Sequence, residues 1–445
     1  MIPRYIRPEM RELWEPARKF GTWLKVEFAV LTARMELREV SPDEYNAILQ
    51  KADFTVERIN ELDEGPQGFK QDMLAFVEAC KETMRTTGVP EAWIGRFHES
   101  VTSYDIEDPA FSLLLVQSAD LILTEIAKLH DALFAQARKH KETKVMGITH
   151  GQAAEVTTLA ARMLGWVDAL ERDSARILSA QLELKVGKFS GAVGIYGDID
   201  PRIEESACTK LGLKPARIAT QIIHRDRHAA YMTALCILAR DLAHIAHNLW
   251  LMCEFPRLEA REPFRKGQRG SSQMPHKKNP WHLERIRGMG NQMIGYLVPV
   301  MIEVVTYDER ALDQSSVERI SWPDATSLVH FMLHSLTEQV AKMQFFPETM
   351  LFNIDKTLGQ CGSGYVKNLL FSKGVTQLTF QGQPMAVYDW VQECANKAWT
   401  EQRHFREVVI EEGILEQVSQ DDLDRCFDYN YYVRNAETIY ARFGI

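Results

Sequence analysis

The chain has 445 residues, of which 45% are hydrophobic and 25% charged, with a formal net charge of -9. This length leaves room for two or three domains around a large core. The acidic balance disfavours nucleic-acid binding as the main role. No apolar run approaches the roughly 18 residues of a membrane span, and the opening MIPRYIRPEM lacks the apolar stretch of a secretory signal. We therefore expect a cytoplasmic protein with neither a nucleic acid nor a membrane as partner.

Seven cysteines are scattered along the chain, and none forms a C-x-x-C pair. The odd number and irregular spacing argue against a disulfide framework or a zinc site and fit a reducing compartment. The chain contains no phosphate-binding Walker loop and no dinucleotide fingerprint. We therefore predict that the protein needs neither a metal ion nor an organic cofactor.

Helical periodicity dominates the hydrophobic pattern, and convincing alternating strands are nearly absent. Apolar residues recur every three or four positions in four segments of about 20–30 residues, which indicates a helix bundle. The four segments are 112–138, 154–184, 225–253 and 325–344.

Glycine and proline clusters separate these segments and set the expected domain boundaries. We predict an all-α fold of three helical domains. They are an N-terminal domain (1–111), a central long-helix bundle (112–360) that contains a loop at 263–280, and a C-terminal domain (361–445).

The loop at 263–280 carries the most informative segment, Gly270-Ser-Ser-Gln-Met-Pro-His-Lys-Lys-Asn-Pro280. Glycine permits unusual backbone angles, and the two prolines keep the segment out of a regular helix. Seven Lys and Arg residues against one acid lie between Arg265 and Arg287. Cations, hydroxyls and amide groups on one loop suit a small polyanion, although a charge run alone is more often a solvated surface.

This segment matches every fixed position of the pattern G-S-S-x-M-P-x-K-x-N-P and so resembles the signature of the fumarase/aspartase superfamily. Members of that superfamily eliminate fumarate from a succinyl compound, and a cycloisomerase branch shares the signature. Further stretches along nearly the whole chain resemble the bacterial type of the adenylosuccinate lyase family. These stretches are Arg4–Met10, Thr102–Asp105, Thr149–Glu155, Lys188–Gly194, Thr220–Gln221, Arg225–His228, Ser315–Arg319 and Cys426–Tyr432.

The resemblance implies β-elimination of fumarate from a succinylamino nucleotide, in purine biosynthesis. Such a reaction needs a base for a weakly acidic C–H, positive charge at the adjacent carboxylate and an acid for the departing nitrogen. The resemblance implies Ser271 as the base, with Ser272 as a companion donor. Lys277 and the loop amides offer a means of lowering the cost of an alkoxide. Lys277 and Asn279 would also hold the succinyl carboxylates.

We predict His150 as the acid, because an imidazole titrates near neutrality and lies here in a family-like context. The segment after it reads as a helix, for which Thr149 and Gln152 would form a capping box. Glu284 would orient the imidazole and stabilise its cation. His98 is a further candidate for the site, although a surface histidine on a helix fits the sequence equally well.

The resemblance also implies the residues that bind substrate and a homotetramer in which several subunits share each active site. Guanidinium groups and hydroxyls match the geometry of a phosphate. The expected phosphate ligands are Arg4, Tyr5, Arg310, Ser315 and Arg319, and Thr102, Ser103 and Gln221 would contact the succinyl and base portions.

The chain departs from the family pattern at the rim of this expected pocket. Lys70-Gln71-Asp72 stands where the family usually has Arg-His-Asp, and an acid is usual at Ala311. Gln71 can donate and accept hydrogen bonds but cannot carry charge. Tyr104 and Glu99 also replace smaller or neutral residues. These departures leave open a paralogue acting on another succinylamino compound, besides the cycloisomerase and an inactive homologue.

Overall fold

The computed structural model describes residues 2–445 and confirms a mainly helical fold. Contacts divide the chain into two compact units, each built from three stretches. Unit 1 comprises residues 1–127, 170–243 and 286–335, and unit 2 comprises 128–169, 244–285 and 336–445. The three-domain division at 111 and 360 stays a prediction.

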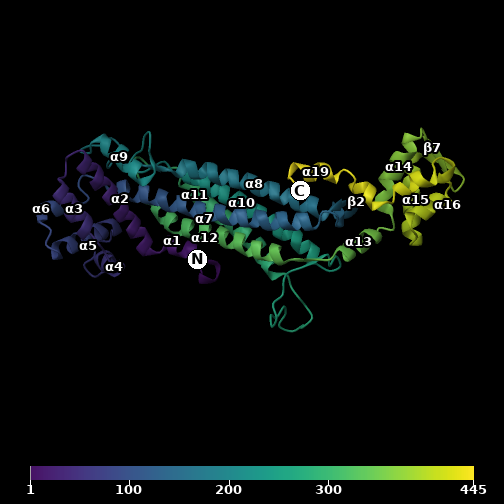
Figure 1. Cartoon of the computed structure of the whole chain (residues 1–445), viewed down its shortest axis with the longest axis horizontal. Helices are drawn as coiled ribbons and strands as arrows, with labels where there is room; N and C mark the ends of the chain where they lie inside the picture. Colours follow the sequence, from purple (N-terminus) through teal and green to yellow (C-terminus); the bar gives the residue numbers. More distant parts are fainter. Residues whose placement is uncertain (1) are drawn as a thin grey trace. The chain divides into compact units, whose positions relative to one another are not determined.

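Unit 1 contains the N-terminal helices and parts of the long helices (Figure 1). Its shorter elements are η1 (Pro3–Tyr5), α1 (Pro8–Trp14), α2 (Pro16–Glu36), α3 (Pro42–Lys51), α4 (Val56–Glu64), α5 (Asp72–Thr86), α6 (Glu91–Ile94), β3 (Val186–Gly187), α9 (Pro201–Leu211) and β4 (Lys214–Pro215). The long helices α7 (Ser103–Lys139), α8 (Leu159–Leu184), α10 (Asp226–Cys253), α11 (Trp281–Ile302) and α12 (Asp313–Lys342) contribute residues to both units.

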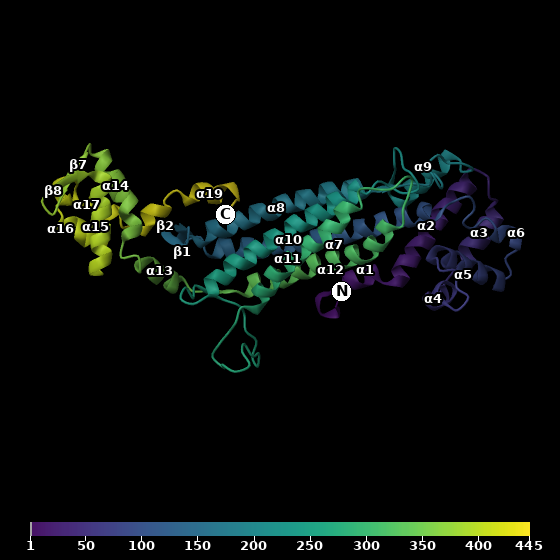
Figure 2. The same cartoon turned by 180° about the vertical axis from the view of Figure 1, so that it is seen from behind.

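Unit 2 contains the remaining elements, and two views show β7 beside α14 and α15 (Figures 1 and 2). Its strands are β1 (Lys144–Thr149), β2 (Gln152–Thr158), β5 (Ala260–Arg261), β6 (Gln344–Phe345), β7 (Gln377–Phe380) and β8 (Gln383–Ala386). Its helices are α13 (Pro347–Asp355), η2 (Gln360–Gly362), α14 (Ser363–Ser372), α15 (Val387–Glu401), α16 (Phe405–Glu411), η3 (Ile414–Glu416), α17 (Gln420–Arg425), α18 (Tyr429–Val433) and α19 (Ala436–Arg442).

Helix α7 and helix α10 are long and apolar enough, by length and composition alone, to cross a membrane. The protein itself buries 56% and 67% of their most apolar windows, as expected for the core helices of a bundle. Two of the predicted helices begin well before their periodic segments, α7 at Ser103 and α12 at Asp313. Both extensions contain a proline, Pro109 and Pro323, which is unfavourable inside a helix and obscured the start.

The helix and capping box expected around Thr149 and Gln152 are wrong, because these residues face each other at the end of an antiparallel hairpin. His150 and Gly151 form the two-residue turn, with φ angles of 52° and 75°. Positive φ at both central residues is the type I′ geometry that joins twisted strands. The flanking β-branched residues and the glycine of the turn were the missed signals, and helix α8 starts only at Leu159.

The buried carboxyl group of Asp173 in unit 1, which lies next to the half-buried Asp241, generates a prediction. Burial, together with the charge of Asp241, raises the pKa of Asp173 to about 7, against the opposing effect of Arg176. A carboxyl group whose folded pKa is raised gives stability that is complete below its unfolded pKa and is lost as the pH rises through the folded value.

The free energy of unfolding of the wild type should therefore fall between pH 5 and pH 8. In Asp173→Asn this fall should be smaller, by roughly 1–3 kcal/mol, because the amide does not titrate. Urea unfolding at several pH values measures this difference. Exposed Asp198→Asn is the control and should follow the wild type. Equal pH slopes for Asp173→Asn and the wild type would contradict the assignment.

Candidate active site

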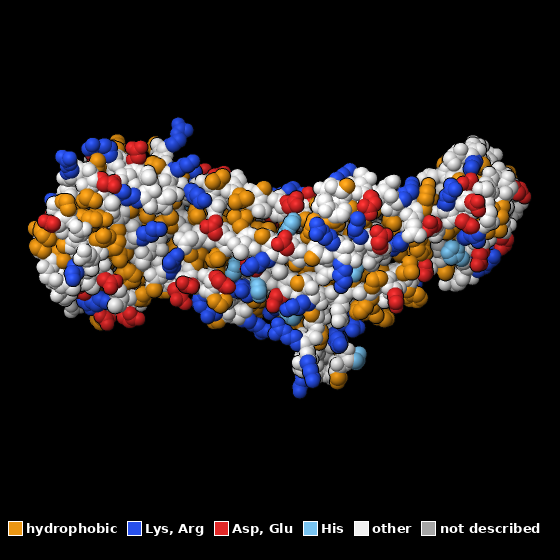
Figure 3. Space-filling view, viewed as in Figure 1, with side chains coloured by type: hydrophobic (Ala, Val, Ile, Leu, Met, Phe, Trp, Pro, Cys, Tyr) orange, Lys and Arg blue, Asp and Glu red, His pale blue; other side chains and the backbone are white. Residues whose placement is uncertain are grey.

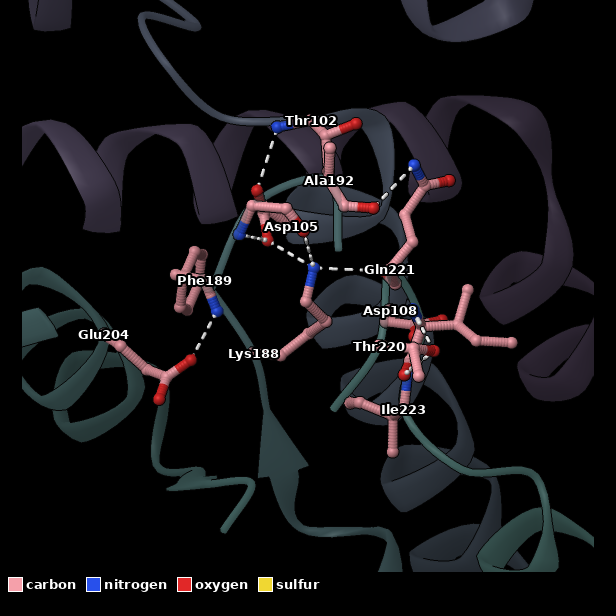
Figure 4. Close-up of polar contacts among 12 residues, drawn as sticks. Thr102, Asp105, Asp108, Lys188, Phe189, Ala192, Glu204, Thr220, Gln221 and Ile223 are labelled. Carbon is pink, nitrogen blue, oxygen red and sulfur yellow. Dashed lines mark hydrogen bonds and ion pairs between the residues drawn. The ribbon is translucent and has the colours of Figure 1, made fainter. Parts of the chain in front are cut away.

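A fully buried ion pair organises the start of α7 (Figure 4). Lys188 Nζ lies 2.6 Å from Asp105 Oδ1, and neither side chain is exposed. Asp105 also accepts hydrogen bonds from the backbone N–H groups of Thr102 (2.8 Å) and Gly191 (3.2 Å). Lys188 donates in addition to the carbonyl oxygens of Gly191 and Gln221, each at 3.0 Å. This pair thereby fixes Thr102 and Gln221, two expected substrate ligands, in one place.

The side chain of Gln221 connects this ion pair to the segment before α12. Its Oε1 accepts a hydrogen bond from Arg310 Nη1 at 2.8 Å, and its Nε2 donates to the carbonyl of Ala192 at 3.2 Å. The guanidinium of Arg310 lies 4.0 Å from the ring centroid of Tyr104, which is within cation–π range. Tyr104, a departure from the family pattern, is therefore a buried platform for an expected phosphate ligand.

A cavity of about 260 Å³ opens beside Tyr104 and is lined by both Ser315 and Arg319. These two residues lie four positions apart on α12 and so share a face. Arg319 Nη2 lies 2.8 Å from Asp72 Oδ2, and Lys19 Nζ lies 2.7 Å from the same oxygen. Despite burial, the charge of Lys19 and then that of Arg319 hold the pKa of Asp72 below its usual value.

Glu107 lines the same cavity among the aromatic side chains of Trp14, Trp23 and Phe111. Burial, and secondarily the charge of Asp72, raises the pKa of Glu107 to about 7. A large part of this carboxyl group is therefore neutral at physiological pH.

A second buried network stands behind Tyr104. Arg225 pairs with both oxygens of Asp108, at 3.1 and 2.9 Å, and with Glu318 Oε1 at 2.7 Å. Burial raises the pKa of Glu318 to about 7 even though Arg225 opposes the shift. Sequence reasoning assigned no role to Asp105, Asp108, Lys188 or Arg225, although all four lie in or next to the family-like motifs.

The other residues expected to bind substrate in unit 1 differ in their surroundings. Tyr5 packs against Phe331 with ring centroids 5.4 Å apart, and Arg4 is exposed. Ser103 is the first residue of α7. Lys70 has a positive φ of 56° and bonds Glu64, whereas Gln71 is exposed at the start of α5.

His98 is neither on a helix nor free. Its Nδ1 lies 2.5 Å from Glu27 Oε1, and its φ is 62°. Burial lowers the pKa of His98, but the charge and hydrogen bond of Glu27 raise it overall above the ordinary value. Glu99, another departure, is held by Arg34 at 2.7 Å. Both residues therefore have structural partners of their own.

The signature loop in unit 2 stands clear of the helices, and Lys and Arg side chains gather on it (Figures 1 and 3). Ser271 is partly exposed, and its Oγ accepts a hydrogen bond from the backbone N–H of Met274 at 3.1 Å. Ser272 and Lys277 are exposed.

Gly270 and Asn279 stabilise the base of this loop, where its two ends approach each other. A Cβ atom at Gly270 would collide with the carbonyl oxygen of Lys277, so glycine is needed for close approach. Asn279 Nδ2 donates to the carbonyl of Gly270 at 3.1 Å. In this conformation Asn279 closes the base of the loop.

The expected acid and its orienting carboxylate also lie in unit 2, but without mutual contact. His150 is exposed on the hairpin turn, and Glu284 Oε1 accepts a hydrogen bond from Trp250 Nε1 at 3.0 Å. Within residues 2–445, no hydrogen bond or ion pair joins His150, Ser271 and Glu284. The structure thus brings together Thr102, Gln221, Arg310 and their neighbours, and it leaves the catalytic candidates separate within one chain.

Comparisons with known proteins support the family that the signature segment indicates. The family model described as "Lyase" matches residues 6–295, and the model "Adenylosuccinate lyase C-terminus" matches residues 381–443. The chain is 37% identical to adenylosuccinate lyase of Bacillus subtilis, over 100% of both chains. It is also 37% identical to that of Thermotoga maritima, over 100% of this chain and 99% of the relative.

Solved structures agree with the fold. A 3-carboxy-cis,cis-muconate lactonizing enzyme from Pseudomonas putida superposes with a TM-score of 0.86 at 26% identity, covering 98% of this chain and 96% of that one. A fumarate lyase from Mesorhizobium sp. BNC1 gives a TM-score of 0.85 at 22% identity, covering 99% and 98%.

The helical bundle and the complete signature define an enzyme of the fumarase/aspartase superfamily of lyases. Within that superfamily, the full-length identity assigns the chain plainly: it belongs to the adenylosuccinate lyase family.

The buried ion pair generates a stability prediction. Replacing Lys188 by methionine leaves Asp105 as an uncompensated buried charge, which costs about 3–5 kcal/mol. We expect Lys188→Met to lower the free energy of unfolding by that amount in a urea titration. Lys210→Met is the matched control, because its pair with Glu36 is partly exposed and is worth less than about 1 kcal/mol. Equal losses in the two variants would contradict the special role of Lys188.

Proposed function

We propose that this protein releases fumarate from adenylosuccinate, and from the imidazole-carboxamide succinyl ribotide, in purine biosynthesis in the cytoplasm. The observation that carries the proposal is 37% identity to adenylosuccinate lyases over the entire chain. The intact signature from Gly270 to Pro280 supports it.

The proposed mechanism is a β-elimination by general base and general acid. Ser271 takes the proton from the carbon beside a succinyl carboxylate, and Lys277 and Asn279 hold the carboxylates as negative charge develops. The electron pair of that C–H bond forms the double bond of fumarate. The C–N bond breaks with its electrons on nitrogen, which receives a proton from His150, oriented by Glu284.

The substrate phosphate would contact Arg4, Tyr5, Arg310, Ser315 and Arg319, and the succinyl and base portions would contact Thr102, Ser103 and Gln221. The proximity of Arg310 to Gln221 supports a common pocket for these two groups. Lys70, Gln71 and His98 would complete its rim. Gln71 could only form neutral hydrogen bonds there.

We further propose a homotetramer whose subunits share each active site. Two observations support it: the exposure of His150 on the hairpin and the bond of Glu284 to Trp250 rather than to an imidazole. Exposed apolar side chains on the helices offer surfaces for association; they include Ile294, Val298, Met301, Ile302 and Ile320.

The activity test is fumarate release from both nucleotides. We expect turnover of each, reduced by about 10²–10⁴-fold in Ser271→Ala and His150→Gln, because each variant removes a proton-transfer group. Ser372→Ala, an exposed serine of α14, is the control and should retain activity. A folded wild-type protein that releases fumarate from neither nucleotide would overturn the proposal and favour another succinylamino substrate. Lys70, Gln71 and Ala311 would then be the residues to examine.

The shared-site proposal has its own test. Mixing inactive Ser271→Ala and His150→Gln chains under conditions that exchange subunits should restore part of the activity, because some sites then receive both native groups. The mass in sedimentation should be four times the 51.0 kDa of one chain. A fully active monomer, or a tetramer without restored activity, would contradict shared sites.

A further inference from the structure

A second cavity, of about 530 Å³, lies wholly within unit 2. Its walls come from hairpin β1–β2, from α8, from the segment before β5, from α13 and the residues that follow it, from η2, from the start of α14 and from α15. None of the residues assigned above to substrate or catalysis lines it. The cavity therefore needs an explanation of its own.

The charges on its walls are mainly positive. Arg162, Arg257 and Lys356 line the cavity together with one carboxylate, that of Glu259, which gives three positive charges against one negative charge. Glu259 is buried and already accepts a hydrogen bond from Asn353 Nδ2 at 3.1 Å. Such an excess of cations in a walled space favours an anionic ligand.

Arg162 is the strongest indication. Burial lowers the pKa of Arg162; the charge of Glu259 opposes this shift, and the smaller effect of Arg257 adds to it. Its Nη2 donates to the carbonyl of Met146 at 3.2 Å, a neutral acceptor. A guanidinium whose burial is only partly compensated is a natural partner for an oxyanion, which its planar fork binds through two hydrogen bonds.

The remaining walls offer neutral donors and a flat apolar surface. Gln152, Thr357 and Ser363 provide donor groups. Trp399 is 58% exposed and Ile148 is 40% exposed, and both line the cavity. An exposed tryptophan beside an anion site suits a ligand with a flat body as well as an anionic group.

We propose that this cavity binds a small phosphate-bearing molecule, with its phosphate on Arg162, Arg257 and Lys356 and its flat portion against Trp399 and Ile148. Ile148 and Gln152 lie two residues before and after His150 on the hairpin. Occupancy therefore holds the hairpin turn in one conformation. The link from this turn to catalysis rests on the proposed function, whereas the binding does not.

The test measures binding directly, with inorganic phosphate and AMP as the two probes. Calorimetric titrations use Arg319→Gln protein, which weakens the proposed phosphate site of the substrate pocket. We expect saturable binding of both probes, tighter for AMP, and at least a tenfold loss in Arg162→Gln and in Lys356→Gln. Lys356 is exposed, so its variant tests the cavity even where Arg162→Gln disturbs folding. Lys342→Gln, an exposed lysine outside the cavity, is the matched control.

Trp399→Leu separates the two sources of phosphate. It should weaken AMP to the level of inorganic phosphate and leave inorganic phosphate unchanged. Hydrogen exchange of residues 144–158 should slow when either probe binds. Absence of saturable binding, or binding that Arg162→Gln and Lys356→Gln leave unchanged, would overturn the proposal. Because no turnover is measured, a failure here is distinct from a failure of the proposed lyase activity.

Discussion

The buried pair of Lys188 and Asp105 is the interaction on which the expected substrate pocket depends. Both groups are completely removed from water, so each must be satisfied by the other and by backbone groups. The pair meets this demand by contacting Thr102, Gly191 and Gln221, which belong to three separate stretches of the chain. A change in any of these stretches would remove a hydrogen bond from a fully buried charge. The geometry of Thr102 relative to Gln221 is therefore fixed before any substrate arrives.

The guanidinium of Arg319 is held less firmly than the buried pair of Lys188 and Asp105. Arg319 contacts Asp72 but keeps about half of its side chain exposed, and exposed pairs are worth little. A phosphate can therefore replace Asp72 as the partner of Arg319 at small cost. The pKa of Glu107 is about 7, and the protonated form of this carboxyl group carries no negative charge to repel the phosphate. Arg310 differs, because Tyr104 and Gln221 hold it from two sides. In the proposed function, Arg310 would therefore position the phosphate and Arg319 would adapt to it.

Four of the long helices, α7, α8, α10 and α12, and the signature loop were predictable from sequence because their signals are local, although the starts of α7, α8 and α12 were not. Apolar periodicity gave α10 to within a residue, and proline placed 263–280 outside a helix. The hairpin was missed because β2 runs directly into α8, so residues 154–158 were assigned to the helix. The role of Gly270 was expected to be unusual backbone angles, yet the structure needs it for close approach to Lys277. The networks of Lys188 and Arg225 could not be predicted, because they join residues more than 80 positions apart.

Exposure of the catalytic candidates places a constraint on how the proposed elimination can work. A serine alkoxide is costly in water, and in this conformation Ser271 receives one backbone hydrogen bond on a solvated loop. Positive charge from Lys277 acts weakly while water screens it, but strongly once water is excluded. A second surface must therefore cover the loop before Ser271 becomes a base. His150 lies on an equally exposed turn, and a neighbouring subunit bringing such a turn to the loop would supply both the cover and the acid. Tetramer formation and activation of the serine would then be one event.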